Sequence, residues 1–398
     1  MTATSSAPLH VAIACGGTGG HLFPGLAVAE QLRACGVAVS VLISPKEVDQ
    51  QAVRAASGVE VATLPAVAWQ RGSRLGFFLG FFQSWRAARR LFRSRNTAAV
   101  LAMGGFTAAP PVLAGRGLRC KTFLHESNTI PGKANRWLAS RVDVAFVGFP
   151  EASRRLSARE FAVTGTPVRA ELRRGDAAAS RMELGLDPDR PVVLITGGSQ
   201  GASRINNLIL ETLPHLTGPT RNWQWLHLAG TRDVETVRAA YAACGVTAMV
   251  HPFLNRMPLA LRAATVCVSR AGASSLAELA AVRLPAILIP LPSAADNHQW
   301  HNAHAYAESG AAILLEQPTV TPERLVKSLQ GLIEDAIARA TMQTALAKWD
   351  HSKAAEMIVG RILQTLGRSV AAEKLSLEKL SGSDEESRLM QIESVVVV

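Results

Sequence analysis

Several sequence signatures that would assign a function directly are missing from this 398-residue chain. Its five cysteines are scattered and form no C-x-x-C pair, which favours reduced thiols in a cytoplasmic protein over a disulfide-bonded secreted one. The pattern G-x-x-x-x-G-K-[ST] is absent, which argues against a P-loop nucleotidase. H-E-x-x-H is absent too, and His298, His301 and His304 follow a spacing that spirals round a helix, so we expect no metal site.

Long hydrophobic runs are also missing. The aromatic run 75–82 is far shorter than the ~20 apolar residues that cross a bilayer. Residues 1–10 lack the basic and apolar regions of a signal peptide, and we expect none. With 18% charged and 48% hydrophobic residues, the composition is typical of a globular protein, and the length leaves room for two domains.

Acidic residues are absent from one long stretch. Residues 61–125 contain ten Lys and Arg but no Asp or Glu. The net charge of +11 lies in the first half, because residues 1–170 hold 20 basic and 8 acidic side chains whereas residues 171–398 hold 22 and 23. In the densest part, residues 69–95, arginines are interleaved with Phe and Trp.

Docking on an anionic membrane surface is the interpretation we favour for segment 69–95. Aromatic side chains would enter the interface while arginines meet the headgroups, each contributing about 1 kcal/mol. No recognised nucleic-acid module surrounds the arginines, so we expect no nucleic-acid partner. The alternative is an ordinary amphipathic helix with a solvated basic face, whose core-facing residues are Phe81, Trp85, Ala88 and Phe92. The side chains expected at the membrane are Trp69, Phe77, Phe78, Phe81, Phe82, Trp85, Arg86, Arg89 and Arg90.

What the sequence does contain is one sequence pattern that occurs twice, 181 residues apart. Residues 11–15 run into Gly-Gly-Thr-Gly-Gly at 16–20, and residues 192–196 run into Gly-Gly-Ser-Gln-Gly at 197–201. Each copy predicts a buried strand, a glycine turn and a helix N-terminus, an arrangement that favours anions. The third glycine of G-x-G-x-x-G is replaced by Leu22, which argues against a dehydrogenase.

Strand and helix signals alternate along the chain, which predicts an α/β protein with parallel sheets. Strands are expected at 10–15, 38–43, 98–102, 120–124, 143–147, 161–164, 192–196, 223–228, 246–250, 264–268 and 286–290. Helices are expected at 22–34, 46–56, 77–95, 106–116, 131–140, 203–213, 233–243, 256–262, 273–281, 297–309, 322–332, 336–347 and 352–366. We predict an N-terminal domain over 1–168, a C-terminal domain over 169–350, a helix over 351–368 that packs back on the N-terminal domain, and a poorly ordered tail over 369–398.

Polar residues follow the predicted strands of the first half. His21, beside the glycine turn, has an ordinary pKa near 6.5 that suits a general base, although a helix-capping or core histidine is the alternative. A third glycine turn lies at 103–107, and His-Glu-Ser-Asn follows at 125–128. Because ligands bind at the carboxyl ends of parallel strands, we expect a polar crevice here. Taken singly, Glu126 or Asn128 would more often fix a loop.

In the second half, residues 269–278 follow a strand and begin a helix with small and hydroxyl residues, so a diphosphate could approach the backbone N–H groups closely. Ser275 and Glu278 have the spacing of a capping box, whose alternative is a carboxylate that binds ribose hydroxyls. Residues 296–302 add amides and imidazoles near another helix start.

Taken in order, these motifs form a series that is far more specific than any one of them. The series comprises GGTGGH at 16–21, GGF at 104–106, HESN at 125–128, PGKAN at 131–135, GTPVR at 165–169, GGSQG at 197–201, RAGA at 270–273 and Glu278. It closely resembles the MurG family of bacterial peptidoglycan glycosyltransferases, over roughly residues 10–365.

The resemblance implies a GT-B fold, in which two Rossmann-like domains with parallel sheets face an interdomain cleft. It implies inverting transfer of N-acetylglucosamine from UDP-GlcNAc to the 4-hydroxyl of MurNAc in undecaprenyl-pyrophosphoryl-MurNAc-pentapeptide (lipid I), giving lipid II for peptidoglycan synthesis, without a cofactor. The implied location is the cytoplasmic face of the cell membrane, as a peripheral protein. Other cell-wall synthesis and division proteins are implied as further partners.

The resemblance also implies a role for individual residues of the second domain. Ser199, Ser274 and Ser275 would face the diphosphate. Glu278 would bind the ribose, with Arg169 and Leu254 on the uracil side. The implied donor-binding residues are Thr18, Gly19, Gly20, Asn128, Arg169, Ser199, Gln200, Gly201, Asn206, Leu254, Ser274, Ser275, Glu278, His298, Gln299 and Asn302, of which the last three match sugar contacts.

The first domain would hold the lipid acceptor, with its pyrophosphate at the 16–20 and 104–106 turns. His21 is the implied general base and Glu126 the second catalytic residue. The implied acceptor-binding residues are Gly16, Gly17, Gly104, Gly105, Phe106, His125 and Asn135.

Some positions depart from the family pattern. Phe106 stands where tyrosine is usual, Thr166 where asparagine is usual, and His298 where the first glutamine of a pair is usual. Ser203 stands where arginine is frequent, with Arg204 beside it as a compensating cation. Two alternatives remain open from the sequence: another GT-B enzyme, such as a UDP-sugar epimerase or a transferase for soluble acceptors, and a basic nucleic-acid-binding protein.

Overall fold

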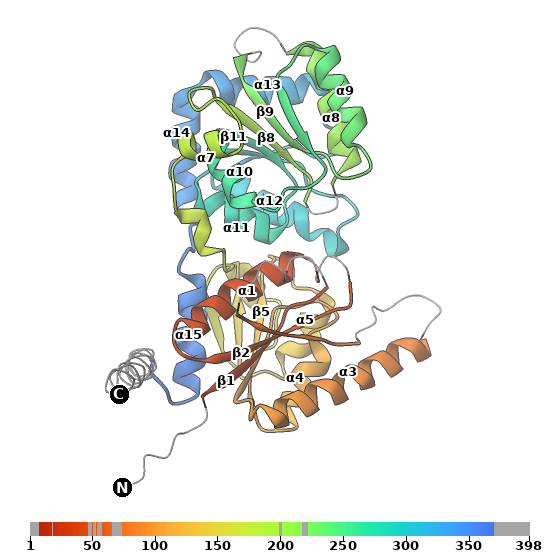
Figure 1. Ribbon diagram of the computed structural model, residues 1–398, viewed down its shortest axis with the longest axis vertical. Helices are drawn as coiled ribbons and strands as arrows, with labels where there is room; N and C mark the ends of the chain where they lie inside the picture. The colour runs from red at the N-terminus through yellow and green to blue at the C-terminus, as the bar shows by residue number, and fades with distance from the viewer. Residues whose placement is uncertain are drawn as a thin grey trace, which may run out of the picture.

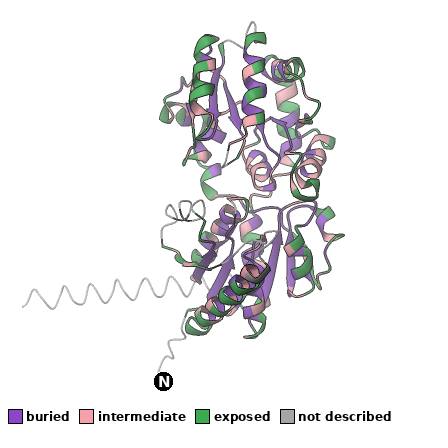
Figure 2. Cartoon of the chain, turned by 90° about the vertical axis from the view of Figure 1, so that its right-hand side faces the viewer, coloured by how far each residue is buried: buried purple, intermediate pink, exposed green. Residues whose placement is uncertain are grey.

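The computed structural model arranges the chain as two α/β domains stacked along its long axis (Figure 1). Each domain has a wholly parallel sheet at its centre with helices outside it, and the strands are the most buried part of each (Figure 2). The structure describes residues 8–17, 19–46, 50, 53, 58–65, 74–198, 201–216 and 222–369.

The sheet of the first domain has seven strands in the order β3-β2-β1-β4-β5-β6-β7. Most of them are runs of fully buried apolar residues, which a parallel sheet requires because helices cover both of its faces. The strands are β1 (His10–Ala14), β2 (Ala38–Ile43), β3 (Glu60–Thr63), β4 (Ala99–Ala102), β5 (Lys121–Glu126), β6 (Val144–Val147) and β7 (Phe161–Val163).

The sheet of the second domain has six strands in the order β10-β9-β8-β11-β12-β13. In both sheets the strand order reverses beside the strand that precedes a glycine turn, β1 in one and β8 in the other. Ligands of open parallel sheets bind at this reversal, so both turns occupy the expected position for a ligand site. The strands are β8 (Val192–Thr196), β9 (Gln224–Leu228), β10 (Ala248–His251), β11 (Val266–Ser269), β12 (Ala286–Leu288) and β13 (Ile313–Leu314).

The helices follow the strands in alternation. Those of the first domain are α1 (Gly19–Arg33), α3 (Arg74–Ser94), α4 (Ala109–Arg116), α5 (Lys133–Ala139) and α6 (Pro150–Ser153). Those that follow are α7 (Ala177–Glu183), α8 (Ser203–Thr212), α9 (Val234–Ala243), α10 (Met257–Ala263), α11 (Ala273–Ala281), α12 (His298–Glu308), α13 (Pro322–Glu334), α14 (Ala336–Ala347) and α15 (Ala354–Thr365).

The last helix of the described residues, α15, lies against the first domain although it follows the second in sequence (Figure 1). Ile358 and Ile362 are fully buried in one hydrophobic cluster with Val28 and Leu32 of α1. The chain thus passes between the domains twice. The two crossings touch, because a Cβ added to Gly165 would clash with His351.

Helix α3 projects along and beyond the first domain (Figure 1). Ala88 and Phe92 are buried against the sheet, as the amphipathic alternative required, whereas Phe78 and Phe82 toward the start of the helix are 61% and 52% exposed. Among the residues that the structure describes, no helix is long and apolar enough to cross a membrane. Trp69 lies outside those residues, as do residues 370–398 of the expected tail.

Candidate active site

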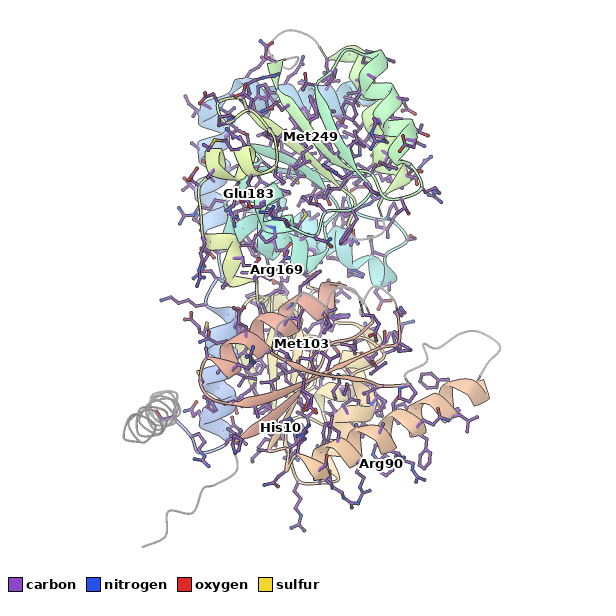
Figure 3. The ribbon with its side chains drawn as sticks, viewed as in Figure 1. His10, Arg90, Met103, Arg169, Glu183 and Met249 are labelled. Atoms are coloured by element: carbon purple, nitrogen blue, oxygen red, sulfur yellow. The ribbon has the colours of Figure 1, made fainter. Side chains whose placement is uncertain are left out.

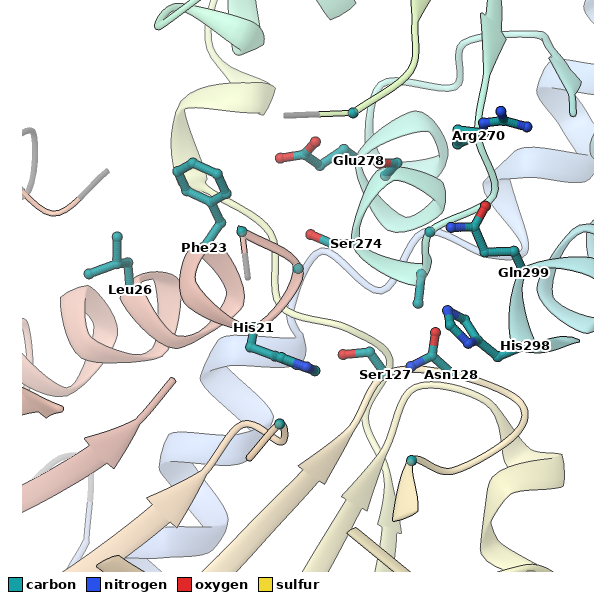
Figure 4. Close-up of a pocket in the computed structure, with 18 of the residues that line it drawn as sticks. His21, Phe23, Leu26, Ser127, Asn128, Arg270, Ser274, Glu278, His298 and Gln299 are labelled. Atoms are coloured by element: carbon teal, nitrogen blue, oxygen red, sulfur yellow. The ribbon is translucent and has the colours of Figure 1, made fainter. Parts of the chain in front are cut away.

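A cavity of about 1900 Å³ opens between the two domains and is lined by residues of both. From the first domain it receives the start of α1, the turn before α4 and the loop between β5 and α5. From the second domain it receives the turn after β8, the loop after β10 and the start of α11 (Figure 4). The cavity is therefore placed at the carboxyl ends of the strands, where the sequence predicted a crevice.

His21 lies in the first turn of α1 and lines this cavity (Figure 4). Its ring rests on the glycine turn after β4. A Cβ on Gly104 would lie 3.1 Å from Cε1 of His21, and one on Gly105 would lie 3.2 Å from Cδ2. Both glycines also have positive φ values, +102° and +77°. Only glycine lets the turn accept the histidine ring at this distance.

Thr107 joins the two glycine turns of the first domain, since its hydroxyl donates to the carbonyl of Gly16 at 2.7 Å. Gly19, Gly20, Gly105 and Phe106 line the cavity. The other expected contacts of these turns, Gly16, Gly17 and Gly104, do not line it, so they shape the turns instead of facing the cavity. Thr18 lies outside the described residues.

Phe106, which lacks the hydroxyl of the usual tyrosine, is packed beside a cation. The ammonium of Lys46 lies 5.2 Å from the centroid of its ring and donates to the carbonyl of Gly17 at 3.1 Å. No role was predicted for Lys46, which lies shortly after the end of β2.

Glu126, at the end of β5, is 2% exposed and its carboxylate accepts four hydrogen bonds. Oε1 accepts from the backbone N–H and the side-chain amide of Asn128 at 2.9 and 3.0 Å. Oε2 accepts from the backbone N–H of Gly132 at 2.9 Å and from Nδ2 of Asn135 at 2.7 Å. These bonds use both oxygens to fix the loop, which favours a positioning role over the catalytic role expected from the sequence.

His125 departs from the expected acceptor-binding role. It is fully buried, does not line the cavity, and its Nε2 lies 2.9 Å from the carbonyl oxygen of Gly165. Burial lowers the pKa of His125, so the ring stays neutral and serves to hold the interdomain linker. Asn135 does line the cavity.

Arg169 and Glu278 meet at the junction between the domains, where Figure 3 labels the arginine. Nη2 of Arg169 donates to Oε1 of Glu278 at 2.8 Å, and both side chains are mostly buried. The guanidinium also lies 4.7 Å from the ring centroid of Phe23, on α1 of the other domain. All three side chains line the cavity; the sequence had not assigned a role to Phe23.

The capping-box alternative for Glu278 is wrong. Helix α11 begins at Ala273, and its N-cap is Gly272, which has no side chain to offer. Ser275 therefore lies in the third helical position and cannot pair with Glu278 as an N-cap. Because no side chain caps the helix, the N–H groups of its first turn remain at the cavity wall beside Ser274 and Ser275.

The glycine turn after β8 contributes Gly197 and Gly198 to the cavity. Gly201 does not line it, because it packs against the next strand: a Cβ there would lie 2.7 Å from the carbonyl oxygen of Ala229. Ser199 and Gln200 lie outside the described residues. At the start of α8, Arg232 donates to the hydroxyl of Ser203, so a cation does reach the position where the family often has arginine.

Asn206 is also placed differently from the expectation. It is 2% exposed and does not line the cavity, and its amide donates to the carbonyl of Ala229 and to Asp233, both at 2.8 Å. Its Oδ1 lies 3.0 Å from Nε2 of His227, whose pKa burial lowers to about 3. The expected donor contact is therefore part of a buried network that supports the turn.

Asn302, a third expected donor contact, is fully buried and does not line the cavity. Its neighbours on α12, His298 and Gln299, do line it (Figure 4). Oε1 of Gln299 accepts from the backbone N–H of Leu291 at 3.0 Å, which leaves the amide hydrogens of Gln299 available as donors.

Leu254 lines the cavity as expected, next to Phe253, whose ring is 50% exposed and was not predicted. Arg270, from the RAGA motif at 270–273, also lines it, but its guanidinium donates to the carbonyls of Ile289 and Pro290 and to Gln317. Within the described residues no group of His, Cys, Asp and Glu side chains could hold a metal ion.

Two family models match the chain. The N-terminal domain of glycosyltransferase family 28 matches residues 11–147, and the C-terminal domain of the same family matches residues 192–358. The chain is 34% identical over 381 residues to the UDP-N-acetylglucosamine–N-acetylmuramyl-(pentapeptide) pyrophosphoryl-undecaprenol N-acetylglucosamine transferase of Anaeromyxobacter dehalogenans (strain 2CP-1), covering 90% of this chain and 94% of the relative.

A protein of the same name from Xanthomonas euvesicatoria pv. vesicatoria is 38% identical over 372 residues, covering 92% of this chain and 84% of the relative. Among solved structures, the crystal structure of Acinetobacter baumannii MurG matches with a TM-score of 0.70 and 28% identity, over 90% of this chain and all of that one. The fold is therefore GT-B, and the chain belongs to the MurG family within glycosyltransferase family 28.

Proposed function

We propose that this chain transfers N-acetylglucosamine from UDP-GlcNAc to the 4-hydroxyl of MurNAc in lipid I, with inversion, and so makes lipid II. The observation that carries the proposal is the cavity between the domains, since it brings His21 of one domain and the start of α11 of the other to one space. Relatives whose alignments cover about nine-tenths of this chain, at 34% and 38% identity, carry the name of this transferase.

The donor would bind on the second domain. The uncapped N-terminus of α11, with Ser274 and Ser275 beside it, presents N–H groups and a positive dipole end that stabilise the negative charge of the leaving UDP. Glu278 would bind the ribose hydroxyls while Arg169 holds one of its oxygens. The exposed ring of Phe253 offers an apolar face to the uracil beside Leu254.

The donor sugar would then project across the cavity toward the first domain. Gln299, His298 and Asn128 line this part of the cavity (Figure 4), and the free amide hydrogens of Gln299 suit hydroxyl oxygens of the sugar. Gly19 and Gly20, at the start of α1, would lie on the opposite side of the sugar and the phosphates.

The acceptor would bind on the first domain. His21 would accept the proton of the MurNAc 4-hydroxyl as that oxygen attacks the anomeric carbon, and UDP would leave from the opposite face. The loop fixed by Glu126 would hold Asn135 at the acceptor side of the histidine. Gly105 and Phe106, also on the cavity wall, would contact the acceptor pyrophosphate.

Because the acceptor is linked to a lipid, the enzyme would have to act at a membrane surface. We propose that this surface is the cytoplasmic face of the cell membrane. The exposed aromatic side chains of α3 and its arginines support this docking surface. Partners among other cell-wall synthesis and division proteins follow from the family resemblance alone.

The decisive experiment measures UDP release by the full chain with UDP-GlcNAc and a lipid I analogue, each alone and together. We expect release only with both substrates, and a disaccharide product linked to the lipid. Release without an acceptor, or equal turnover of water-soluble acceptors that resemble no part of lipid I, would point to another enzyme of the same fold.

A further inference from the structure

Asn302 makes four hydrogen bonds that join the two domains. Its Oδ1 accepts from the backbone N–H and from the hydroxyl of Thr129, both at 3.0 Å. Its Nδ2 donates to Oδ1 of Asn128 at 3.0 Å and to the carbonyl of Ala271 at 3.2 Å. Every strong donor and acceptor position of the amide plane is occupied, and the side chain is fully buried.

The partners of Asn302 belong to the two halves of the active site. Asn128 and Thr129 lie in the loop that Glu126 fixes beside His21. Ala271 immediately precedes the N-cap of α11, the helix that would stabilise the leaving UDP. One side chain of α12 therefore connects two segments of the site. They are the loop between β5 and α5, residues 127–132 (the acceptor loop), and the turn between β11 and α11, residues 270–272 (the donor turn).

These bonds also fix the orientation of a second amide. Because Oδ1 of Asn302 is used by Thr129, its N–H groups must face Asn128 and Ala271, and Oδ1 of Asn128 must be the acceptor. The amide nitrogen of Asn128 is then directed to Oε1 of Glu126, at 3.0 Å. A flip of either amide would set like groups against each other, so the network has one satisfied arrangement.

We propose that Asn302 is a positioning residue, which locks the acceptor loop to the donor turn and so sets the distance between His21 and the donor sugar. This role replaces the sugar contact that the family resemblance implied for Asn302. It rests on the proposed transferase reaction for its kinetic consequence, but the lock itself is a structural statement.

Other contacts between the domains are less suited to this role. Arg136 and Asp296 form an ion pair of 2.7 Å, but their side chains are 40% and 39% exposed, and such pairs contribute little in water. Phe149 packs on Tyr306 and Trp349, with ring centroids 6.2 and 5.5 Å away. These rings do not line the cavity, so they join the domains without orienting groups in it.

The test compares Asn302→Leu, which keeps the volume but removes all four bonds, with Thr129→Val, which removes only the hydroxyl bond from the opposite domain. Arg136→Ala is the matched control, because it breaks the exposed ion pair between the same domains. The measurements are kcat with a lipid I analogue, and Kd for UDP and for UDP-GlcNAc separately.

We expect Asn302→Leu to lower kcat roughly 10- to 100-fold, because small displacements of reacting groups have effects of this size. Thr129→Val should lower kcat in the same way but less, and Arg136→Ala should change it less than twofold. The ratio of the two Kd values should stay that of the wild type in Thr129→Val and Arg136→Ala, because both variants keep the bond between Asn302 and Asn128.

A different pattern would overturn the proposal. If Asn302→Leu weakens UDP-GlcNAc binding but not UDP binding, and Thr129→Val behaves as the wild type, then Asn302 touches the sugar. If the leucine variant does not fold, Asn302→Asp serves instead, because aspartate can still accept from Thr129 but cannot donate to Asn128 or Ala271.

A second measurement is independent of catalysis. Hydrogen exchange at the backbone N–H of Thr129, whose acceptor is Asn302, should accelerate in Asn302→Leu and stay unchanged in Arg136→Ala. Unchanged exchange in the leucine variant would overturn the lock. A wild-type chain that never releases UDP would refute the transferase proposal instead, so the two failures are distinguishable.

Discussion

The two glycine turns share one sequence pattern but, in the residues that the structure describes, present opposite ends to the cavity. After β1, the helix side of the turn faces it, through Gly19 and Gly20. After β8, the strand side faces it, through Gly197 and Gly198. The turn after β1 lies near the glycine turn after β4, on which the His21 ring rests. The turn after β8 is instead supported by the buried hydrogen bonds of Asn206. In the proposed reaction, the same local arrangement would support a proton acceptor in one domain and bind a diphosphate in the other.

The largest expected effect is on the base side of this comparison. His21→Ala should lower kcat about 10²- to 10⁴-fold, the usual contribution of a general base, while Kd for UDP-GlcNAc changes little. The measurement is steady-state kinetics together with calorimetric donor binding. A kcat within threefold of the wild type would show that His21 is not the general base. The proposed difference in role between the two turns would then be lost as well.

The donor side should respond in KM instead of kcat. Glu278→Ala removes a carboxylate that would bind both ribose hydroxyls, and charged hydrogen bonds contribute about 1.5–3 kcal/mol, so KM for UDP-GlcNAc should rise roughly 10- to 100-fold. Glu278→Gln, which keeps the shape, should have a smaller effect. An unchanged KM with a lower melting temperature would leave Glu278 only its ion pair with Arg169.

Alanine substitutions in the turns test the comparison directly. Gly105→Ala would press on the His21 ring, 3.2 Å away, and should lower kcat roughly tenfold. At Gly198 the added Cβ meets no atom of the described residues within 4 Å and would enter the cavity, so KM for the donor should rise instead. Gly245→Ala, which also has positive φ and open surroundings, reports the backbone strain alone, about 1 kcal/mol of stability. If Gly105→Ala and Gly198→Ala changed kcat and KM in the same way, the two turns would not have the different roles that we propose.

The charge difference between the domains leads to a membrane prediction. Phe78→Ser should weaken binding to vesicles that contain anionic lipid about fivefold, because an exposed aromatic ring loses about 1 kcal/mol of burial in the interface. Ile337→Ser, in the second domain and 79% exposed, is the control and should have no effect. Co-sedimentation of both variants with the same vesicles measures this, and equal losses would argue against docking through α3.

The smallest expected effect concerns pH and the second turn. The pKa of His227 is lowered to about 3 by burial, so the neutral ring contributes stability that is fully present above pH 6.5 and is lost progressively as pH falls toward 3. The part of the unfolding free energy that depends on this ring should decrease by about 1 kcal/mol between pH 7.5 and 5.5. His227→Gln should abolish that share of the pH dependence in denaturant titrations, and an unchanged slope would place its cause elsewhere.

The sequence predicted the sheets better than it predicted single side chains. Buried strands such as β1 and β8 are continuous apolar runs beside glycine turns, so they could be located directly. β3 was missed because it lies at the sheet edge and its side chains are largely exposed, which leaves no buried run to detect. Helix α4 was expected to begin at residue 106 but begins at Ala109, because residues 104–107 form a glycine turn.

Polar site residues were harder to assign because sequence does not show which way an amide or imidazole is buried. His125, Asn206 and Asn302 stand in motifs of the site, yet all three are inside the protein with their hydrogen bonds satisfied. Phe23 and Phe253 line the cavity but look like core residues in sequence. Partners distant in the chain decide these cases, and a motif does not contain them.

The return of α15 to the first domain determines how this protein can be divided for experiments. A fragment that ends before residue 354 would leave the apolar surface of α1 uncovered and should be prone to aggregation. Chimaeras between relatives should therefore exchange α15 together with the first domain, not with the second. The folding unit of the acceptor half is therefore discontinuous, and its final segment is synthesised only after the whole donor half.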